Sequence, residues 1–548
     1  MKGKNKTVAI LTLGCKLNFA ESSAIAQEFK KHGFAEVEHN ESADIYIVNT
    51  CSVTEHSDKK CRQSIRKMHK QNIVAPIIVT GCYSQLKPEE VSKIEGVSAV
   101  IGQEHKGEIF KFAEEFLKKS TAAGQTVNRR LAVKKSGSER ITKKETDNKK
   151  ITEHAIIYSS DILKTASIFP AYSYGERTRS FLKVQDGCDY YCTYCTVPLA
   201  RGHSRSVSSE IAVEQAKTLA AEGVKEIVLT GVNIGDYGRD INKSSRAKAA
   251  NANATNVNAT NANATNANAT NANTTNANAT NANATNANAT NANATNANAT
   301  NANATKANAT NANAAKDNLD NILTTASDYF LQLLKSLNAV EGIERYRISS
   351  IEPNLLRTNI IDWIASGTKF QNHFHIPLQS GCDSVLARMK RRYNTKMFAE
   401  KIAYIREKMG DVFFGIDVIV GFPGETEEEF MQTYNFLSEE IKPAFLHIFP
   451  YSRRTGTIAD SMPGQVPEIV KTNRVATLEK LSDKLHADYI KRFKGTEQEV
   501  LFEAAEKLRA CKDGKTIKAT MSGYTGNYIR IKTAYNPELI GKIVKVKI

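Results

Sequence analysis

Three cysteines in one short loop, Cys188, Cys192 and Cys195, have the spacing C-x3-C-x2-C and follow a strand-like run at Ser180–Val184. Iron–sulfur clusters are held by cysteine thiolates, usually four of them. Three thiolates so close would hold three irons of a 4Fe–4S cube and leave the fourth iron open for a substrate or cofactor. A zinc site is the alternative, but zinc usually takes four ligands with C-x2-C pairs, and no second pair follows here.

A second set of three cysteines, Cys15, Cys51 and Cys82, is spread over the N-terminal region, and each one closes a strand-like segment. In open α/β sheets the carboxyl ends of the strands gather at one edge, where ligands bind. Three thiolates from distant sequence positions would then converge there. Three ordinary buried cysteines are the alternative, because cysteine is a small hydrophobe that is common in cores. The same placement after three successive strands favours a second three-cysteine cluster, with Cys61 incidental.

The elements that must position this second set alternate between strand and helix, which is typical of a parallel α/β sheet. We assign residues 1–117 to this α/β domain. Residues 118–170 are rich in Lys, Ser and Thr without clear periodicity, so they are expected to be a basic linker. Its basic half, Arg129–Lys150, is either a contact for RNA or a solvated charged stretch. The expected strands are Thr7–Leu13, Ile45–Val48 and Ile77–Thr80, and the expected helices are Ala20–His32, Ser57–Lys70 and Pro88–Ile94.

Strand–helix alternation resumes in residues 171–455, and six such units fit an open (β/α)6 barrel. The carboxyl ends of the predicted strands carry polar or Gly-rich segments, and function collects at that face of a barrel. The repetition of such segments at successive strand ends indicates one shared site. The six expected strands are Ser180–Val184, Glu226–Leu229, Tyr346–Ser349, His373–Ile376, Phe413–Val420 and Phe445–Phe449.

The predicted barrel is interrupted by a low-complexity tract of Asn, Ala and Thr repeats at residues 249–315. Asn and Thr are poor helix formers and the tract has almost nothing to bury, so we expect a disordered insert in a surface loop. Residues 456–494 are expected to be a helical connector, and residues 495–548 a small β-barrel. The expected strands of this last region are Val500–Glu503, Thr516–Met521, Tyr528–Lys532 and Ile543–Ile548.

Composition narrows the class of protein. The 548 residues carry a formal charge of +16, which suits a nucleic-acid partner. Nothing resembles a signal peptide and no run approaches the length of a membrane span, so no membrane partner and a cytoplasmic location are expected. Nine cysteines without a secretory signal then indicate thiol or metal chemistry in a reducing compartment instead of a disulfide framework.

The motifs resemble those of a known family. GCDYYCTYC at the head of a predicted barrel is similar to the cluster motif of the radical S-adenosylmethionine (SAM) superfamily. TLGCKLN, VNTCSVT and VTGCYSQ resemble the three motifs of the methylthiotransferase N-terminal domain, and GYTGNYIRI resembles the final motif of a TRAM domain, an RNA-binding module. The chain is therefore identified as a member of the radical SAM methylthiotransferase family.

The resemblance implies two 4Fe–4S clusters and SAM as cofactors, with the radical SAM cluster on Cys188, Cys192 and Cys195. An auxiliary cluster would be held by Cys15, Cys51 and Cys82. One SAM would methylate a sulfur on the auxiliary cluster, and a second would give the radical that abstracts the substrate hydrogen. By their strand-end positions we expect Gly231, Asn233, Ser350 and Gln379 to hold SAM. Asp417 and Glu352 either accept hydrogen bonds from SAM or the base, or form buried salt bridges.

The expected partners are a tRNA anticodon stem-loop, an electron donor such as flavodoxin or ferredoxin, and a sulfur donor. Candidate RNA-binding residues in the last region are Lys515, Lys518, Arg530 and Lys532, for which a charged solvated surface is the alternative. TLGCKLN, GCDYYCTYCTVPLARGHSRS and HIFPYSRRTGT look most like the branch that modifies N6-threonylcarbamoyladenosine in tRNA. Other branches modify isopentenyl-adenosine in tRNA or an aspartate of a ribosomal protein. A non-catalytic iron–sulfur protein would leave the barrel motifs unexplained.

Overall fold

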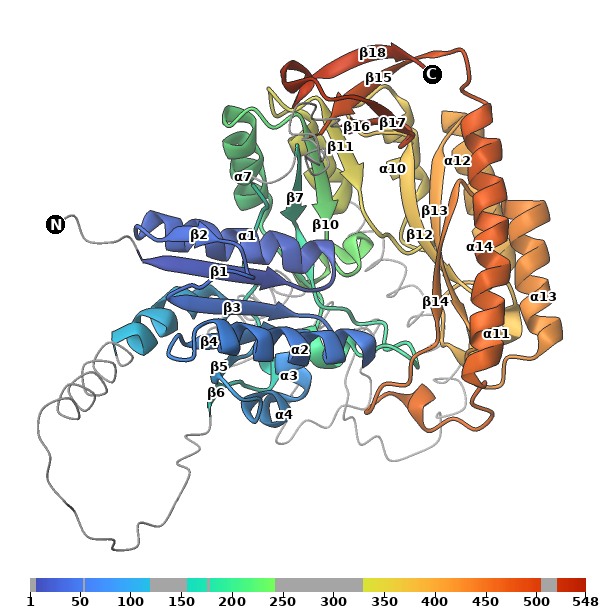
Figure 1. Ribbon diagram of the computed structural model, residues 1–548. Helices are drawn as coiled ribbons and strands as arrows, with labels where there is room; N and C mark the ends of the chain where they lie inside the picture. Colours follow the sequence, from blue (N-terminus) through green and yellow to red (C-terminus); the bar gives the residue numbers. More distant parts are fainter. Residues whose placement is uncertain (1–5, 53–54, 119–154, 175–177, 242–328, 504–519) are drawn as a thin grey trace, which may run out of the picture. The chain divides into compact units, whose positions relative to one another are not determined.

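The computed structural model describes residues 6–52, 55–118, 155–174, 178–241, 329–503 and 520–548 (Figure 1). The chain divides into two compact units, Met1–Asp236 with Leu331–Ile548, and Tyr237–Phe330. In the second unit the rings of Tyr237 and Phe330 lie 6.3 Å apart, and the expected low-complexity insert lies outside the described residues. The elements below all belong to the first unit.

The N-terminal region forms one parallel sheet of six strands in the order β2-β1-β3-β4-β5-β6. Every residue of β3 is buried, as expected for a central strand of a parallel sheet that is covered on both faces. The strands are β1 (Thr7–Thr12), β2 (Ala35–Val37), β3 (Ile45–Thr50), β4 (Ile77–Gly81), β5 (Val97–Ile101) and β6 (Ile156–Tyr158). The helices are α1 (Lys16–Lys31), α2 (Glu55–Gln71), α3 (Cys82–Leu86) and α4 (Pro88–Ser92).

Three strands of this sheet agree with the sequence prediction, and β2, β5 and β6 are additional. Strand β6 lies within residues 118–170, which were expected to be a linker, and it pairs with β5. It is three residues long and mostly exposed, so it lacks the apolar alternation that marks a strand in a sequence. Residues 119–154 of the expected linker lie outside the described residues.

All six strands expected in residues 171–455 are present, in two parallel sheets of three. One has the order β11-β10-β7 and the other β12-β13-β14. Isolated parallel bridges from Tyr346 to Phe370 and from Ser350 to His375 connect the two sheets, so the strands follow one another as β7-β10-β11-β12-β13-β14. Their bounds are β7 (Arg179–Lys183), β10 (Glu226–Thr230), β11 (Arg345–Ile348), β12 (His373–Gln379), β13 (Phe413–Val420) and β14 (Phe445–Pro450).

Helices cover the outer face of these strands (Figure 1). Arg406 of α12 lies over the ring of Phe414, which in turn stacks on Phe374. Because side chains alternate along a strand, His375 and Asp417 point to the opposite face, which we call the inner face. The remaining elements are β8 (Gln185–Asp186), β9 (Arg205–Ser206), α6 (Val197–Arg201), α7 (Ser209–Ala221), α10 (Thr358–Ala365), α11 (Asp383–Arg388), α12 (Thr395–Met409), α13 (Glu427–Asn435) and α14 (Glu468–Lys491).

The C-terminal region is an antiparallel sheet of four strands in the order β17-β16-β15-β18. They are β15 (Glu497–Phe502), β16 (Thr520–Thr525), β17 (Arg530–Ala534) and β18 (Ile543–Lys547). The expected α/β class with parallel sheets is therefore confirmed. Three of the strands expected in this last region are present, whereas most of the expected strand Thr516–Met521 lies outside the described residues and β16 begins at Thr520. Closure of these four strands into a small β-barrel stays a prediction.

Tyr528, in the turn between β16 and β17, lies at the start of the parallel strands. Its ring is 4.5 Å from that of His373 in β12 and 5.3 Å from that of Phe413 in β13. The guanidinium groups of Arg347 in β11 and Arg179 in β7 lie 4.9 Å and 5.5 Å from the same ring centroid. Side chains from both three-stranded sheets thus converge on one tyrosine, which closes the inner face at its amino end.

None of the described helices is long and apolar enough to cross a membrane.

Candidate active site

The loop with Cys188, Cys192 and Cys195 joins β8 to α6, beyond the carboxyl end of β7. Backbone hydrogen bonds hold it, since the N–H of Cys188 donates to the carbonyl of Gly202 and that of Cys195 to the carbonyl of Cys192, both at 3.0 Å. Tyr191 adopts a left-handed φ of 51°, which helps to turn the chain between the first two cysteines.

The three thiols of this loop influence one another, as closely spaced ligands do. Burial, together with the neighbouring Cys192, raises the pKa of Cys195 to about 12. The Sγ of Cys192 accepts a hydrogen bond from Arg391 at 3.1 Å, and that of Cys195 accepts one from the backbone N–H of Val197 at 3.4 Å. Donors aimed at sulfur stabilise a thiolate and tune an iron–sulfur cluster. The residues present fit a cluster on three thiolates.

The second set of cysteines lies at the carboxyl edge of the N-terminal sheet. Cys15 caps α1, Cys51 directly follows β3, and Cys82 opens α3 immediately after β4. A Cβ on Gly14 would lie 2.8 Å from the Sγ of Cys51, so the chain next to Cys15 packs directly on Cys51. Burial raises the pKa of Cys82, and Cys15 adds to this. The structure therefore places the three cysteines at one edge, as their sequence positions predict.

The other buried cysteine of this region belongs to the core. Cys61 lies on α2 and packs with Val48, Ile65 and Met68 in one hydrophobic cluster. Burial raises the pKa of its thiol to about 12. The interpretation of Cys61 as incidental agrees with this environment.

A buried charge cluster, which the sequence analysis missed, connects α1 to β7 and to the loop of the first cysteine set. The carboxylate of Glu21 accepts from Lys106 at 2.5 Å, Lys183 at 2.7 Å and Arg201 at 3.0 Å. Asp186 pairs with Lys183 at 2.7 Å and Arg201 at 2.9 Å. Two carboxylates thus face three cations, which leaves one positive charge in excess.

Arg201 lies between the two cysteine sets. Burial lowers its pKa, but Asp186 and Glu21 raise it, Cys82 and Cys15 add to the increase, and the net pKa is well above its usual range. The guanidinium is therefore permanently charged. A cluster held by three thiolates carries negative charge, which this cation would offset.

The four residues expected to hold SAM lie at the ends of β10, β11 and β12. Gln185 Oε1 accepts the backbone N–H groups of Val232 and Asn233, each at 2.9 Å, and so fixes the turn that contains Gly231. Asn233 is 3% exposed, and its Oδ1 has no hydrogen-bond partner in the described part of the chain. A buried acceptor without a partner fits a site that a ligand fills.

The other two of these residues lie beside the inner face. Ser350 bridges to His375, and Gln379 has a left-handed φ of 68° at a register shift of β12. Within the described part of the chain, neither of them forms a hydrogen bond with Gly231 or Asn233.

Both carboxylates that the sequence analysis singled out have side-chain partners. Glu352 forms an ion pair with Arg391, the arginine that donates to Cys192. Asp417 Oδ1 lies 2.5 Å from Nε2 of His375, at hydrogen-bond distance. Neither His375, which lies within β12, nor Arg391, which lies between α11 and α12, was predicted as a site residue.

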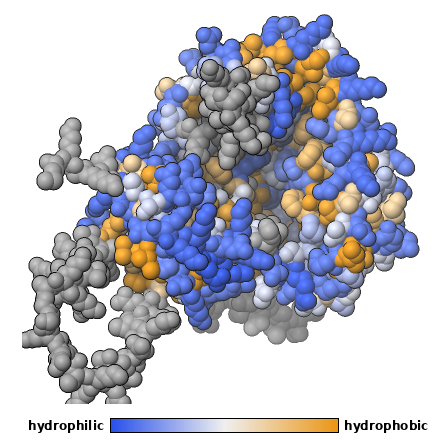
Figure 2. Space-filling model, in the orientation of Figure 1, coloured by the Kyte–Doolittle hydropathy of each residue, from blue (hydrophilic) through white to orange (hydrophobic). Residues whose placement is uncertain are grey.

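The RNA-binding candidates are only partly described. Arg530 and Lys532 lie on β17, an edge strand, and Arg530 donates to Ser522 Oγ at 3.1 Å. Lys515 and Lys518 lie outside the described residues. A further positive surface lies on α2, where hydrophilic residues gather in Figure 2. Its exposed basic side chains are Lys59, Lys60, Arg66, Lys67 and Lys70.

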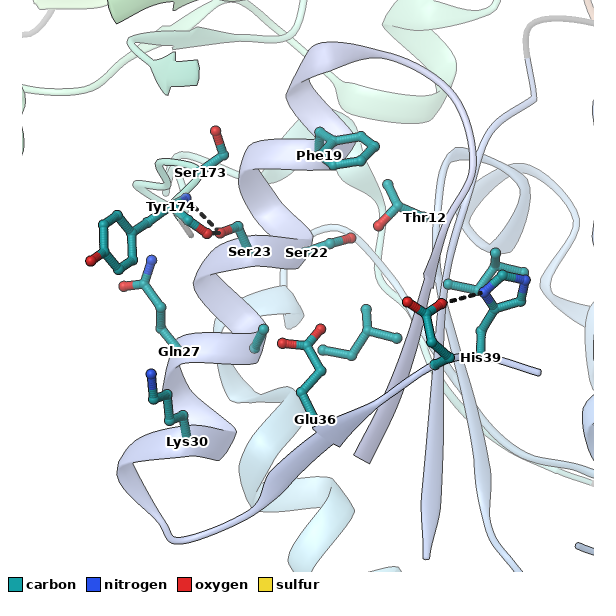
Figure 3. A pocket seen from close by; sticks show the side chains of 14 residues that line it. Thr12, Phe19, Ser22, Ser23, Gln27, Lys30, Glu36, His39, Ser173 and Tyr174 are labelled. Atoms are coloured by element: carbon teal, nitrogen blue, oxygen red, sulfur yellow. Dashed lines mark hydrogen bonds and ion pairs between the residues drawn. The ribbon is translucent and has the colours of Figure 1, made fainter. Parts of the chain in front are cut away.

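A cavity of ≈ 560 Å³ opens on the N-terminal sheet between α1 and β1 (Figure 3). Ser22, Ser23 and Gln27 of α1 line it, with Thr12 and Glu36 on the strand side. None of the predicted site residues lines this cavity. This cavity is therefore separate from the residues that the sequence predicts for the site.

Comparison with known proteins defines the class first. Residues 182–274 and 322–437 match the family model described as the radical SAM superfamily, which places the chain among radical SAM enzymes. Residues 7–102 match the model described as uncharacterized protein family UPF0004. A radical SAM enzyme uses SAM and an iron–sulfur cluster.

Curated relatives then define the family. The chain is 35% identical over 546 residues to the threonylcarbamoyladenosine tRNA methylthiotransferase MtaB of Bacillus subtilis (strain 168). This alignment covers 99% of this chain and 93% of that protein. It is 30% identical over 541 residues to MtaB of Aquifex aeolicus (strain VF5), with 99% and 100% covered. The chain therefore belongs to the MtaB-like radical SAM methylthiotransferase family and is an enzyme of that class.

More distant similarities were also found. The chain is 26% identical over 551 residues to the tRNA-2-methylthio-N(6)-dimethylallyladenosine synthase of Carboxydothermus hydrogenoformans, with 99% of this chain and 96% of that protein covered. Among solved structures, the radical SAM methyltransferase TsrM from Kitasatospora setae aligns with a TM-score of 0.44 and 11% identity, over 83% of this chain and 77% of that chain.

Proposed function

We propose that this enzyme transfers a methylthio group to C2 of N6-threonylcarbamoyladenosine next to the tRNA anticodon. The product would be 2-methylthio-N6-threonylcarbamoyladenosine. The observation that carries this proposal is the 35% identity over nearly the whole chain to an enzyme named for that substrate. Relatives named for dimethylallyladenosine are less similar, at 26% identity. The alternatives are methylthiolation of isopentenyl-adenosine in tRNA and of a ribosomal-protein aspartate.

We assign one 4Fe–4S cluster to Cys188, Cys192 and Cys195, and a second, auxiliary cluster to Cys15, Cys51 and Cys82. When bound, the clusters and SAM supply the radical and the methylated sulfur that an unactivated C–H carbon requires. Arg391 would hold the thiolate of Cys192 in place through its hydrogen bond and its ion pair with Glu352. Arg201 would offset the negative charge of the auxiliary cluster.

We retain Gly231, Asn233, Ser350 and Gln379 as the proposed cradle of SAM, supported for Asn233 by its unpartnered buried oxygen. The proposed partners are the tRNA anticodon stem-loop, a flavodoxin- or ferredoxin-like electron donor and a sulfur donor. Residues 495–548, with Arg530, Lys532, Lys515 and Lys518, are proposed as a TRAM-like RNA-binding domain, and residues 1–117 as the domain of the auxiliary cluster.

The test is mass spectrometry of tRNA nucleosides from cells in which the gene is deleted and then complemented. We expect 2-methylthio-N6-threonylcarbamoyladenosine to disappear, to return with the wild type and with Cys61→Ala, and to stay absent with Cys192→Ala. Purified Cys192→Ala should lose about half of its iron and its ability to cleave SAM. An unchanged nucleoside together with a lost mass shift on a ribosomal protein would instead establish the protein substrate.

A further inference from the structure

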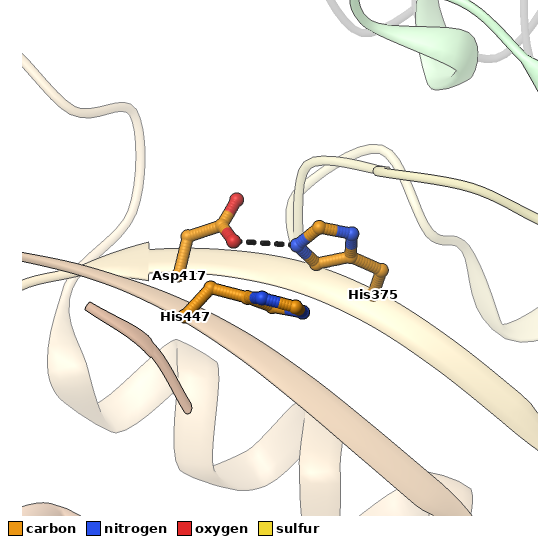
Figure 4. Close-up of side chains that lie close together, drawn as sticks. All are labelled: His375, Asp417 and His447. Carbon is orange, nitrogen blue, oxygen red and sulfur yellow. Dashed lines mark hydrogen bonds and ion pairs between the residues drawn. The ribbon is translucent and has the colours of Figure 1, made fainter. Parts of the chain in front are cut away.

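Three polar side chains of neighbouring strands meet on the inner face (Figure 4). Nε2 of His375 in β12 lies 2.5 Å from Oδ1 of Asp417 in β13. The ring of His447 in β14 lies 4.8 Å from that of His375, at an angle of 38°. One ligand atom from each residue lies within 4.8 Å of the others. We call these three residues the inner polar cluster.

Strand register brings the cluster together. Asp417 is the direct partner of His447, and Gly415 is the direct partner of His375. Since Gly415 has no side chain, the imidazole of His447 can lie over its position: a Cβ there would be 3.6 Å from Nε2 of His447. The missing side chain leaves the three polar groups of the cluster facing one another.

The cluster lies one layer above the tyrosine that closes the amino end of the inner face. His373, two residues before His375, contacts the ring of Tyr528, so a group that reaches the cluster must come from the carboxyl ends of the strands. The Cys188 loop and the proposed SAM residues lie at those ends. The cluster therefore forms the floor beneath the proposed reaction site.

The two modified adenosines that appear in the names of the relatives differ in the group attached to N6. A threonylcarbamoyl group carries urea N–H donors, carbonyl and hydroxyl groups and a carboxylate, whereas a dimethylallyl group has none of these. Beyond the hydrogen bond between His375 and Asp417, an apolar group would leave the remaining donors and acceptors of the partly buried cluster without partners, which costs binding free energy. The polar group can satisfy both donors and acceptors.

We propose that His375, Asp417 and His447 form the subsite for the threonylcarbamoyl group on N6 of the target adenine. The inference rests on the proposed function and assigns its substrate selectivity to named residues. The carboxylate of Asp417 accepts from a urea N–H or the hydroxyl, and the imidazole of His447 donates to a carbonyl or carboxylate oxygen. Sites built to hydrogen-bond a substrate reject analogues that lack the group by large factors.

The experiment compares two anticodon stem-loop RNAs that carry threonylcarbamoyladenosine or dimethylallyladenosine. Both kcat/KM and the equilibrium Kd are measured with the cluster-loaded enzyme. For His447→Phe and Asp417→Asn we expect kcat/KM on the first RNA to fall about 10–100-fold, with a matching rise in Kd and a smaller preference over the second RNA. His447→Gln, which keeps a hydrogen-bonding group, should recover part of the loss.

The matched control is His39→Phe, because His39 is 46% exposed and lies outside the inner face. It should behave as the wild type. Iron content and SAM cleavage without RNA should be unchanged in every variant, which separates a substrate subsite from a folding defect.

Three results would overturn the inference. One is a wild-type preference that survives in His447→Phe and Asp417→Asn. Another is loss of iron or of SAM cleavage in these variants. The third is a stoichiometric divalent ion that Asp417→Asn loses, which would make the cluster a metal site. Failure of the proposed function is distinguishable, because the wild type would then not act on the threonylcarbamoyl RNA at all.

Discussion

Glu21 holds together the buried charge cluster next to the cysteine sets. Its carboxylate is fully buried and binds Lys106, Lys183 and Arg201, and Asp186 also pairs with Lys183 and Arg201. Removing one partner of a buried ion pair leaves an uncompensated charge, which is strongly destabilising.

We therefore predict that Glu21→Gln lowers the free energy of unfolding by about 3 kcal/mol or more. The measurement is the thermal midpoint of the cluster-loaded protein. Glu28→Gln, on the same helix but 44% exposed, should change the midpoint little. Equal midpoints for both variants would show that the buried cations find other partners.

Two histidines of β12 and β14 predict how stability responds to acid. Burial lowers the pKa of His447 to about 4 from its usual 6.5, and lowers that of His373 well below its usual range. The unfolded chain binds protons at these groups near pH 6.5, but the folded chain does not. The free energy of unfolding that these two neutral imidazoles contribute is therefore fully present above pH 6.5. It is lost as the pH falls from 6.5 towards 4.

In His447→Phe, the free energy of unfolding lost on acidification to pH 5 should be smaller by about 1 kcal/mol than in the wild type. Denaturant unfolding at pH 7.5 and pH 5, followed by the fluorescence of the single tryptophan, checks it. The exposed His39→Phe should keep the full pH dependence of the wild type. An identical pH dependence in His447→Phe would contradict a neutral, buried imidazole at this position.

The strand ends of the N-terminal sheet are the elements on which the proposed auxiliary cluster depends. Gly14 has a φ of +109° and a Cβ there would lie 2.6 Å from the Cβ of Cys51. Gly81, before Cys82, has a φ of +101° and a Cβ there would lie 2.3 Å from the carbonyl oxygen of Thr50. Both glycines let the chain turn sharply into a cysteine where no side chain fits.

Gly14→Ala should therefore displace Cys51 and reduce the iron bound by the reconstituted protein by about half. Gly33→Ala is the matched control, since Gly33 has a φ of +81° with no atom within 4 Å of its Cβ position. It should cost about 1 kcal/mol through backbone strain and leave the iron content unchanged. Full iron content in Gly14→Ala would place the cluster elsewhere.

The elements of this chain differ in how well they can be predicted from the sequence. The cysteine sets could be predicted, because spacing within a loop and placement after apolar strands are both local patterns. Strands β2 and β6 could not, because each is three residues long and largely exposed. The inner polar cluster was also out of reach, since it depends on the register of β12, β13 and β14 and on the gap at Gly415. Glu21 was missed because its partners, Lys106, Lys183 and Arg201, lie far from it in the sequence.

At the scale of the whole molecule, the formal charge of +16 bears on RNA binding. If tRNA is the substrate, each neutralised phosphate releases counterions, so affinity must fall with salt. We predict at least about a tenfold loss of affinity between 50 mM and 200 mM salt. Replacing both Arg530 and Lys532 by Gln should reduce the slope of log K against log salt by about one to two. Lys31→Gln, at a site that is 71% exposed, serves as the control. An unchanged slope in the double variant would show that β17 does not contact the RNA.

The position of Tyr528 has a consequence for truncations and domain exchanges of this enzyme. Its ring comes from the C-terminal sheet but lies against His373, Phe413 and Arg347 of the parallel strands. A truncation before this sheet would expose the amino ends of the central strands as well as remove the proposed RNA-binding domain. Chimeras that exchange the C-terminal sheet between relatives should therefore work only when the tyrosine and its arginine neighbours are transplanted as one piece.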